Sequence, residues 1–265
     1  MRAVDQTRPV ADRIVDDPYA PWFLGSLARA QLATGRFAKV ILPSLTGYIQ
    51  VRHRYMDDRL VTALADPGVE QVVVLGAGYD MRAYRFADAL AGRPVFEVDY
   101  PSTARRKQRL LAGRALPNAD VRRVQIDFET ETLPGVLGPA GFRTGARTFF
   151  FWEGVSMYLT RAAVKGTLST LRDLGGPGSE LTMDFWQLLD SPDLVATAHR
   201  VSAGLLHFLN EPVTFALHPE DAPDFLGHLG WKTSDVADSA VLAARYVRDG
   251  RPVYPAMFVV HAVAR

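Results

Sequence analysis

Two glycines and an acidic residue follow apolar runs at a spacing that suits nucleotide binding. Residues 72–75 form a short run that favours a buried strand, and Gly76 and Gly78 follow it at once. A second run, residues 95–98, ends at Asp99, which lies 99 − 78 = 21 residues beyond Gly78. Glycine lets the backbone turn close to a ligand, and an acid at this spacing can accept hydrogen bonds from ribose hydroxyls. The pattern predicts the first half of a nucleotide-binding α/β fold with an adenosine-containing cofactor.

The residue three positions after Gly78 distinguishes between cofactors. A dinucleotide site needs a third small residue there, because helix and strand pack closely around a pyrophosphate. Met81 occupies that position. S-adenosyl-L-methionine has no pyrophosphate, so a turn with two glycines suffices for it. An ordinary strand-to-helix turn is the alternative for the glycine pair alone, and Asp99 favours the cofactor.

Four segments, in order along residues 5–185, together resemble the leucine carboxyl methyltransferase family. They are an arginine-bearing helix (52–58), the glycine motif (73–85), an acidic strand end (96–101, with Lys107 beyond it) and an acidic-Gly segment that ends in Tyr-Leu (151–159). Tyr79 and Met81 depart from the smaller or aliphatic residues of the family's glycine loop. The bacterial branch of the family includes O-methyltransferases of polyketides and other natural products. The resemblance therefore implies methyl transfer without identifying the substrate.

The resemblance and the alternation of strands and helices imply an α/β fold of the class I methyltransferase (Rossmann-like) type. Its seven-stranded sheet is expected to be mostly parallel. Residues 1–66, which precede any strand, are expected to form a helical lid or cap, with a simple packing layer as the alternative. Residues 67–265 are expected to form the methyltransferase core. Residues 186–218 interrupt the alternation, and we interpret them as a cap insertion after strand five.

Apolar runs and turn residues place the elements that position the candidate site. The expected strands are residues 71–75, 95–98, 121–126, 148–152, 180–185, 240–247 and 256–264, the last two as an antiparallel hairpin. The expected helices are residues 48–64, 81–91, 102–112, 161–174 and about 219–229. Parallel strands end at the same edge of a sheet, so the glycine pair and the acidic residues that follow the strands should face one crevice.

The resemblance assigns the carboxylate of the cofactor's amino-acid tail to Arg52 or Arg54. A guanidinium group can bind a carboxylate through two parallel hydrogen bonds. We favour Arg52, because Met56 and Leu60 continue its helix face at i+4 and i+8. A surface arginine on a charged helix is the alternative.

Acidic residues at the strand ends supply the other contacts that the resemblance implies. Asp99 should bind the ribose hydroxyls, although it could instead cap the helix that begins near Pro101. Asp127 and the backbone N–H of Phe128 should bind adenine, with local amide capping as the alternative for Asp127. The remaining loop residues expected to contact the cofactor are Gly76, Ala77, Gly78 and Tyr100.

Glu153 follows the apolar run 149–152, and a carboxylate at that depth needs a partner. The resemblance pairs Glu153 with the positive end of the cofactor, its ammonium group. A salt bridge to Arg82 or Arg85 is the structural alternative.

The acceptor oxygen determines whether the reaction needs a general base. A carboxylate is already anionic at neutral pH, whereas a phenol would benefit from a base such as histidine. We favour a carboxylate acceptor. Catalytic candidates are His199 and His207, each of which could instead be structural or exposed, and Tyr158, which could line the pocket but is expected to belong to the core. The aromatic residues of the insertion favour an apolar or aromatic acceptor or a peptide C-terminus; they include Trp186, Phe208 and Phe215.

The composition narrows the function classes further. The 265 residues include 30 Lys and Arg against 29 Asp and Glu, so net charge gives no argument for a nucleic-acid partner. With no cysteine, disulfides and thiolate metal sites are excluded, and no metal site is expected. We find no signal peptide and no apolar run of about 20 residues, and expect a cytoplasmic protein without a membrane partner. A nicotinamide dehydrogenase and a non-catalytic binding protein are the rival interpretations. The oligomeric state is not predicted.

Overall fold

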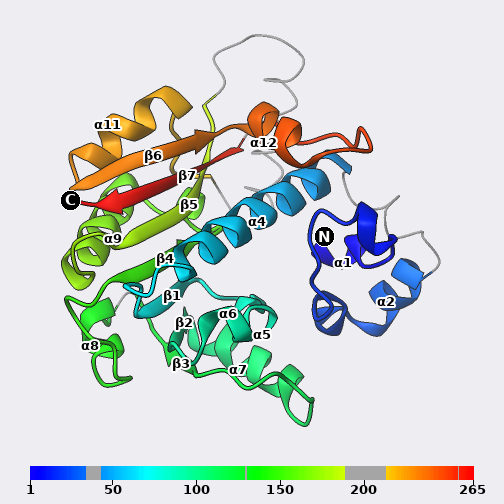
Figure 1. Cartoon of the computed structure of the whole chain (residues 1–265), viewed down its shortest axis with the longest axis horizontal. Coiled ribbons are helices and arrows are strands. Elements are labelled where there is room, and N and C mark those ends of the chain that lie inside the picture. The colour runs from blue at the N-terminus through cyan, green and yellow to red at the C-terminus, as the bar shows by residue number, and fades with distance from the viewer. Residues whose placement is uncertain (34–42, 129, 189–212, 256) are drawn as a thin grey trace.

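One mixed sheet of seven strands forms the core of the part of the chain that the structure, a computed structural model, describes: residues 1–33, 43–128, 130–188, 213–255 and 257–265. The strand order is β3-β2-β1-β4-β5-β7-β6 (Figure 1). The first five strands are parallel, and β7 runs antiparallel to β5 and β6. This confirms the predicted fold class. The strands are β1 (Gln71–Leu75), β2 (Val95–Asp99), β3 (Val121–Gln125), β4 (Thr148–Trp152), β5 (Glu180–Trp186), β6 (Trp231–Ala237) and β7 (Met257–Ala264).

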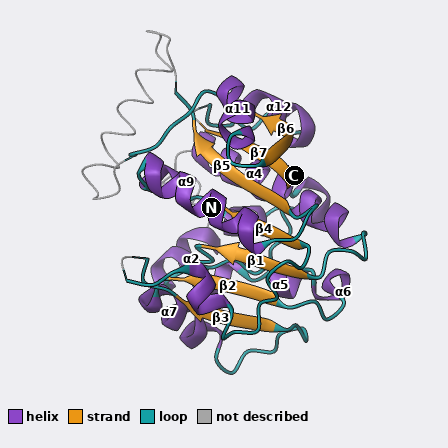
Figure 2. Ribbon diagram, turned by 90° about the vertical axis from the view of Figure 1, so that its left-hand side faces the viewer, coloured by secondary structure: helices purple, strands orange, loops and turns teal. Residues whose placement is uncertain are grey.

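Helices cover both faces of the sheet (Figure 2). One face packs against α4 (Pro43–Leu64), α5 (Arg82–Arg85), α6 (Ala87–Leu90), α7 (Pro101–Leu111) and α12 (Ser239–Tyr246). The other face packs against α8 (Leu133–Leu137), α9 (Arg161–Leu174) and α11 (Ala222–Gly227). The shorter elements are α1 (Arg2–Asp5), α2 (Ser26–Ala33) and the 3₁₀ turns η1 (Val10–Asp12), η2 (Ala20–Phe23), η3 (Ser156–Tyr158) and η4 (Pro219–Asp221).

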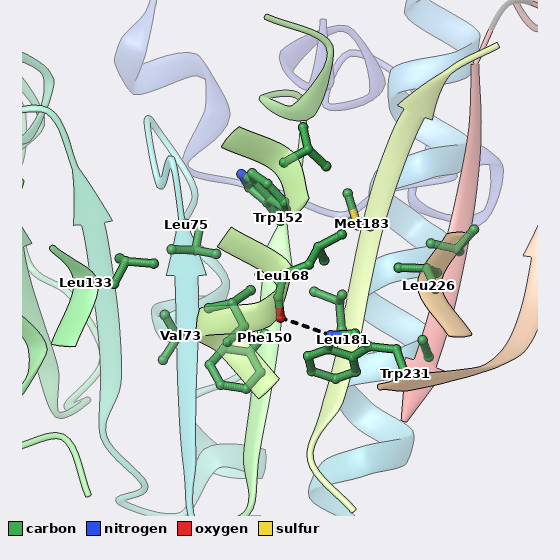
Figure 3. Packing of buried hydrophobic residues seen from close by; sticks show 14 of the residues in the cluster. Val73, Leu75, Leu133, Phe150, Trp152, Leu168, Leu181, Met183, Leu226 and Trp231 are labelled. Carbon is green, nitrogen blue, oxygen red and sulfur yellow. Dashed lines mark hydrogen bonds between the residues drawn. The ribbon is translucent and has the colours of Figure 1, made fainter. Parts of the chain in front are cut away.

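The sequence pattern explains why these elements form. All five residues of β1 and of β4 are buried, as a parallel sheet covered on both faces requires. Helix α9 presents Val164, Leu168 and Leu171 at helical spacing to the sheet. The indole N–H of Trp231 on β6 donates to the carbonyl of Leu168 at 3.1 Å, which links the antiparallel edge to this helix (Figure 3).

Two predicted elements differ from the structure. Residues 81–91 form two short helices, α5 and α6, because the backbone at Phe86 leaves helical geometry (φ −115°, ψ 27°). The predicted strand at residues 240–247 is wrong: β6 lies at 231–237, and α12 follows it. The Asp238 side chain accepts from the N–H of Val241 at 2.8 Å and so caps this helix. The final strands therefore pair antiparallel across a helix rather than through a tight turn.

In the described part of the chain before β1, the elements are the helices α1, α2 and α4 and the 3₁₀ turns η1 and η2. Helix α4 crosses one face of the sheet, and α1 lies against α4 and η2 (Figure 1). The lid role of residues 1–66 stays a prediction. So does the cap role of residues 186–218, most of which lie outside the described residues. Among the described helices, none combines the length and the apolar character that a membrane span requires.

Candidate functional site

The glycine loop lies at the carboxyl end of β1, beside the end of β4. Strand order reverses between these two strands, which is where open α/β sheets bind ligands. Gly76 and Gly78 both have positive φ, +61° and +47°. A Cβ on Gly76 would lie 2.5 Å from the Val155 side chain, so no larger residue fits there. The loop therefore has the tight backbone turn that its sequence predicts.

Asp99 lies at the end of β2 and points toward this loop. Its carboxylate accepts from the N–H of Gly78 at 2.5 Å and from the N–H of Tyr100 at 2.7 Å. Asp99 is not the N-cap residue of α7, because Tyr100 holds that position and makes no capping hydrogen bond with its side chain. Asp99 is half-buried, and its remaining lone pairs are available to hydroxyl donors.

Asp127 follows β3, and the exposed ring of Phe128 comes next. The backbone carbonyl of Asp127 accepts from Thr130 and Glu131, and its N–H donates to the Glu131 carboxylate at 2.9 Å. Phe128 borders a mainly apolar cavity of about 360 Å³ at the carboxyl edge of the sheet. The cavity is a slot between the first turns of α8 and one face of α9, and its lining includes Gly76, Val155, Thr132, Ala163, Gly166 and Thr170.

Arg52 and Glu153 meet in a network of buried charges at the end of β4. The Arg52 Nε donates to Glu153 Oε1 at 3.0 Å, and its Nη1 donates to Asp184 Oδ2 at 2.7 Å. Asp184, on β5, also accepts from the N–H of Gly154 at 2.6 Å. Arg54 lies elsewhere: its side chain is exposed and pairs with Asp58 at 2.8 Å. Of the two predicted arginines, only Arg52 reaches the strand ends.

Arg82 forms the second half of the network. Its guanidinium donates to Glu153 Oε2 at 2.8 Å, to Asp57 Oδ1 at 2.7 Å and to Asp80. The structural alternative for Glu153, a salt bridge to Arg82, is therefore present, and Glu153 also contacts Arg52. Arg85 bonds Asp57 instead, at 2.6 Å.

Neighbouring positive charges favour the ionised forms of Glu153 and Asp80. Burial acts to raise the pKa of Glu153, but Arg82, His53 and Arg52 outweigh it, and the pKa lies well below its usual range. For Asp80 too, burial is the largest single effect and opposes ionisation, but the charge of Arg82 and the other positive groups together outweigh it, and the pKa of Asp80 falls to about 2. For Asp184 burial dominates, so its pKa is raised despite Arg52.

His53 lies at the centre of the network and is held neutral. Burial, followed by the charge of Arg82, lowers its pKa. Its Nδ1 lies 3.2 Å from Glu153 Oε2, and its Nε2 lies about 3 Å from guanidinium nitrogens of Arg2 (3.1 Å) and Arg85 (3.0 Å). Because both ring nitrogens are engaged, His53 is a positioning group for Glu153 rather than a free base.

Of the three catalytic candidates, the structure describes only Tyr158. Tyr158 ends η3 and is 39% exposed, so the expectation of a core tyrosine is wrong. His199 and His207 lie outside the described residues.

Sequence analysis missed Asp184, His53, Asp57 and Asp80 as members of the site. Asp184 interrupts the buried run of β5 in the same way as Glu153 follows β4, so the same signal could have found it. The i, i+4 spacing of His53 and Asp57 on one helix was the other available sign.

Comparison with known proteins agrees with this geometry. Residues 1–172 match the leucine carboxyl methyltransferase family. The chain belongs to this family. A Rhodococcus jostii member, provisionally named an S-adenosyl-L-methionine-dependent methyltransferase, is 36% identical over 190 residues, which span 69% of this chain and 62% of the relative. A provisionally named methyltransferase of the same kind from Mycolicibacterium smegmatis is 33% identical over 252 residues, 88% and 80% of the two chains.

Solved structures show the same fold. A DUF574 family protein from Streptomyces avermitilis superposes with a TM-score of 0.63 at 17% identity, covering 99% of this chain and 100% of that one. A protein from Thermobifida fusca, provisionally named a methyltransferase, superposes with a TM-score of 0.60 at 20% identity, covering 99% of this chain and 97% of that one. The family match confirms the resemblance predicted from the sequence, and both relatives are named for S-adenosyl-L-methionine, the cofactor expected for this chain.

Filling the slot tests whether it takes the adenine ring. Gly166 lines the slot, and a Cβ there meets no atom within 4 Å. We expect Gly166→Leu to fold at least as stably as the wild type, since glycine costs a helix interior about 1 kcal/mol. Its affinity for S-adenosylhomocysteine should fall more than about tenfold by calorimetry, since the added side chain occupies the slot. The exposed Ala162→Leu on the same helix is the control, and equal affinity of the two variants would place the base elsewhere.

Acid should lower the unfolding free energy of the protein, in part through protonation of Asp80. A carboxylate with a lowered folded-state pKa contributes stability above its unfolded pKa, near 4, and loses that contribution as pH falls toward 2. Between pH 5 and pH 2.5 the wild type should lose up to about 2 kcal/mol more unfolding free energy than Asp80→Asn. Urea denaturation at each pH measures this, with the exposed Asp88→Asn as control. Identical pH slopes for wild type and Asp80→Asn would contradict it.

Proposed function

We propose that this protein transfers the methyl group of S-adenosyl-L-methionine to an oxygen atom, and that the acceptor is a carboxylate of a small natural product or of a peptide C-terminus. The observation that carries the proposal is the position of Arg52 beside Glu153. The two opposite charges lie 3.0 Å apart at the switch point of the sheet, next to an apolar slot. A methionine tail carries a carboxylate and an ammonium group on one carbon, and this pair complements both.

Each part of the cofactor then has a partner at the same edge of the sheet. Arg52 would bind the carboxylate of the tail through the guanidinium N–H groups that do not bond Glu153 and Asp184, and Glu153 would accept from the ammonium. Asp99, fixed by the N–H of Gly78, would accept from the ribose hydroxyls. The slot beside Phe128 would hold the adenine ring, with Asp127 at its rim.

The chemistry of the described site favours an acceptor that needs no base. Glu153 has a strongly lowered pKa and is therefore a weak base. His53 is buried with both ring nitrogens engaged. A carboxylate, already ionised near neutral pH, can attack without losing a proton.

The proposed step is an in-line displacement. The acceptor oxygen, about 3 Å from the methyl carbon and opposite the sulfur, forms the new O–C bond while the C–S bond breaks. The bonding pair stays on sulfur, so the sulfonium becomes a neutral thioether and the carboxylate becomes an ester. Opposite charges are consumed together, which is favourable where water is excluded.

A phenol or enol of a polyketide-type natural product is the alternative acceptor. It would need a base, for which His199 and His207 are the candidates, and Tyr158 could line its pocket. Transfer of labelled methyl to a matched panel of carboxylic acids and phenols distinguishes the two. We expect products from the acids, and His199→Ala and His207→Ala should leave the pH profile of turnover unchanged. Products from phenols alone, with a pH profile altered in either variant, would establish the alternative.

Binding of the amino-acid tail can be tested separately from the rest of the cofactor. Arg52→Lys keeps the charge but loses the guanidinium fork, so affinity for S-adenosylhomocysteine should fall about tenfold. Affinity for 5′-methylthioadenosine, which lacks the tail, should stay within about twofold. Arg54→Lys, an exposed change on the same helix, should alter neither affinity. Equal losses for both ligands in Arg52→Lys would refute a contact to the tail.

A further inference from the structure

The N-terminal segment, residues 1–23, contacts the glycine loop through Tyr79. The Arg2 guanidinium donates to the backbone carbonyl of Tyr79 at 2.7 Å. The ring of Phe23, at the end of η2, stacks on the Tyr79 ring with centroids 4.6 Å apart and planes 19° from parallel. Backbone and side chain of the same loop residue are therefore both held by a segment that precedes α4.

Tyr79 stands between two residues that the cofactor site itself fixes. Its neighbour Gly78 donates to Asp99. Its other neighbour, Asp80, pairs with Arg82, and the Asp80 carbonyl accepts from the buried Lys107 ammonium at 2.5 Å. Any displacement of Tyr79 would move the amide that orients Asp99.

Arg2 also connects the segment to the charge network. Its Nη1 lies 3.4 Å from the fully buried Asp17 carboxylate and 3.1 Å from His53 Nε2. His53 in turn contacts Glu153. The segment thus contacts the glycine loop directly, through Tyr79, and reaches Glu153 indirectly, through His53.

We propose that Arg2 and Phe23 are positioning residues for cofactor binding: by holding Tyr79 they keep the glycine loop in its binding conformation. This rests on the proposed function. Ordering a residue's backbone costs conformational entropy, and a loop ordered in advance spares the ligand that cost. The coupling is reciprocal, so a bound cofactor strengthens the docking of the segment by the same factor.

Neighbouring aromatic residues of η2 give a matched pair of variants. Phe23 stacks on Tyr79 of the loop, whereas Trp22 packs on Tyr19 and Arg114. By calorimetry, Phe23→Leu should bind S-adenosylhomocysteine about five- to tenfold more weakly than wild type, and Trp22→Leu should stay within about twofold. Tyr79→Leu should match Phe23→Leu, and the double variant should show no further loss, because one contact is removed in each case.

Hydrogen exchange of the wild-type protein tests the reciprocal effect without a substitution. Addition of S-adenosylhomocysteine should slow amide exchange in residues 2–23 by about the factor by which Phe23→Leu weakens binding. Unchanged exchange there, or equal losses in Phe23→Leu and Trp22→Leu, overturns the inference while leaving the proposed function intact. A wild type that binds no S-adenosylhomocysteine fails the proposed function instead.

Discussion

The buried charges around Arg82 and Glu153 constrain everything else at the carboxyl edge of the sheet. Removing ions from water costs several kcal/mol each, and the cost is offset only when every ion keeps a well-placed partner. Arg82 satisfies this through Asp57, Asp80 and Glu153, which come from α4, the glycine loop and the end of β4. These three segments are therefore fixed relative to one another by charge as well as by packing. Removal of any one of these side chains would leave a buried charge at the site without its partner.

The fold explains why these segments meet. Strand order reverses between β1 and β4, so the loops that follow these strands diverge to opposite faces and leave a crevice between them. Helix α4, earlier in the chain than either strand, crosses the same edge and brings Arg52 to it. The residues that form one site are thus far apart in the sequence, and Arg52 and Glu153 are separated by 101 positions.

The core of the fold was predictable because its signals are local. The bounds of β1, β4 and α9 follow directly from apolar runs, a threonine cap and a glycine stop. The helix at 239–246 was mistaken for a strand, since its short apolar stretch suits either structure and only the capping bond of Asp238 distinguishes them. In the site, the strand-end residues were predictable, whereas the partners of Glu153 were not. Which guanidinium reaches a carboxylate is decided by tertiary packing, which spacing along the chain does not encode.

The paired charges also bear on which ligands the crevice accepts. Arg52 and Glu153 are paired with each other, and Asp184 and Arg82 extend the pair into a network of opposite charges. A ligand group with one net charge would therefore leave an unmatched ion in a buried place. A zwitterionic tail introduces no net charge. Its carboxylate offers a partner to Arg52, and its ammonium offers a partner to Glu153. Its two charged groups sit on a single carbon, at a separation close to that of the protein pair. Under the proposed function, selection for an amino-acid tail would follow from charge balance, and the glycine loop would bring the ribose into register with Asp99.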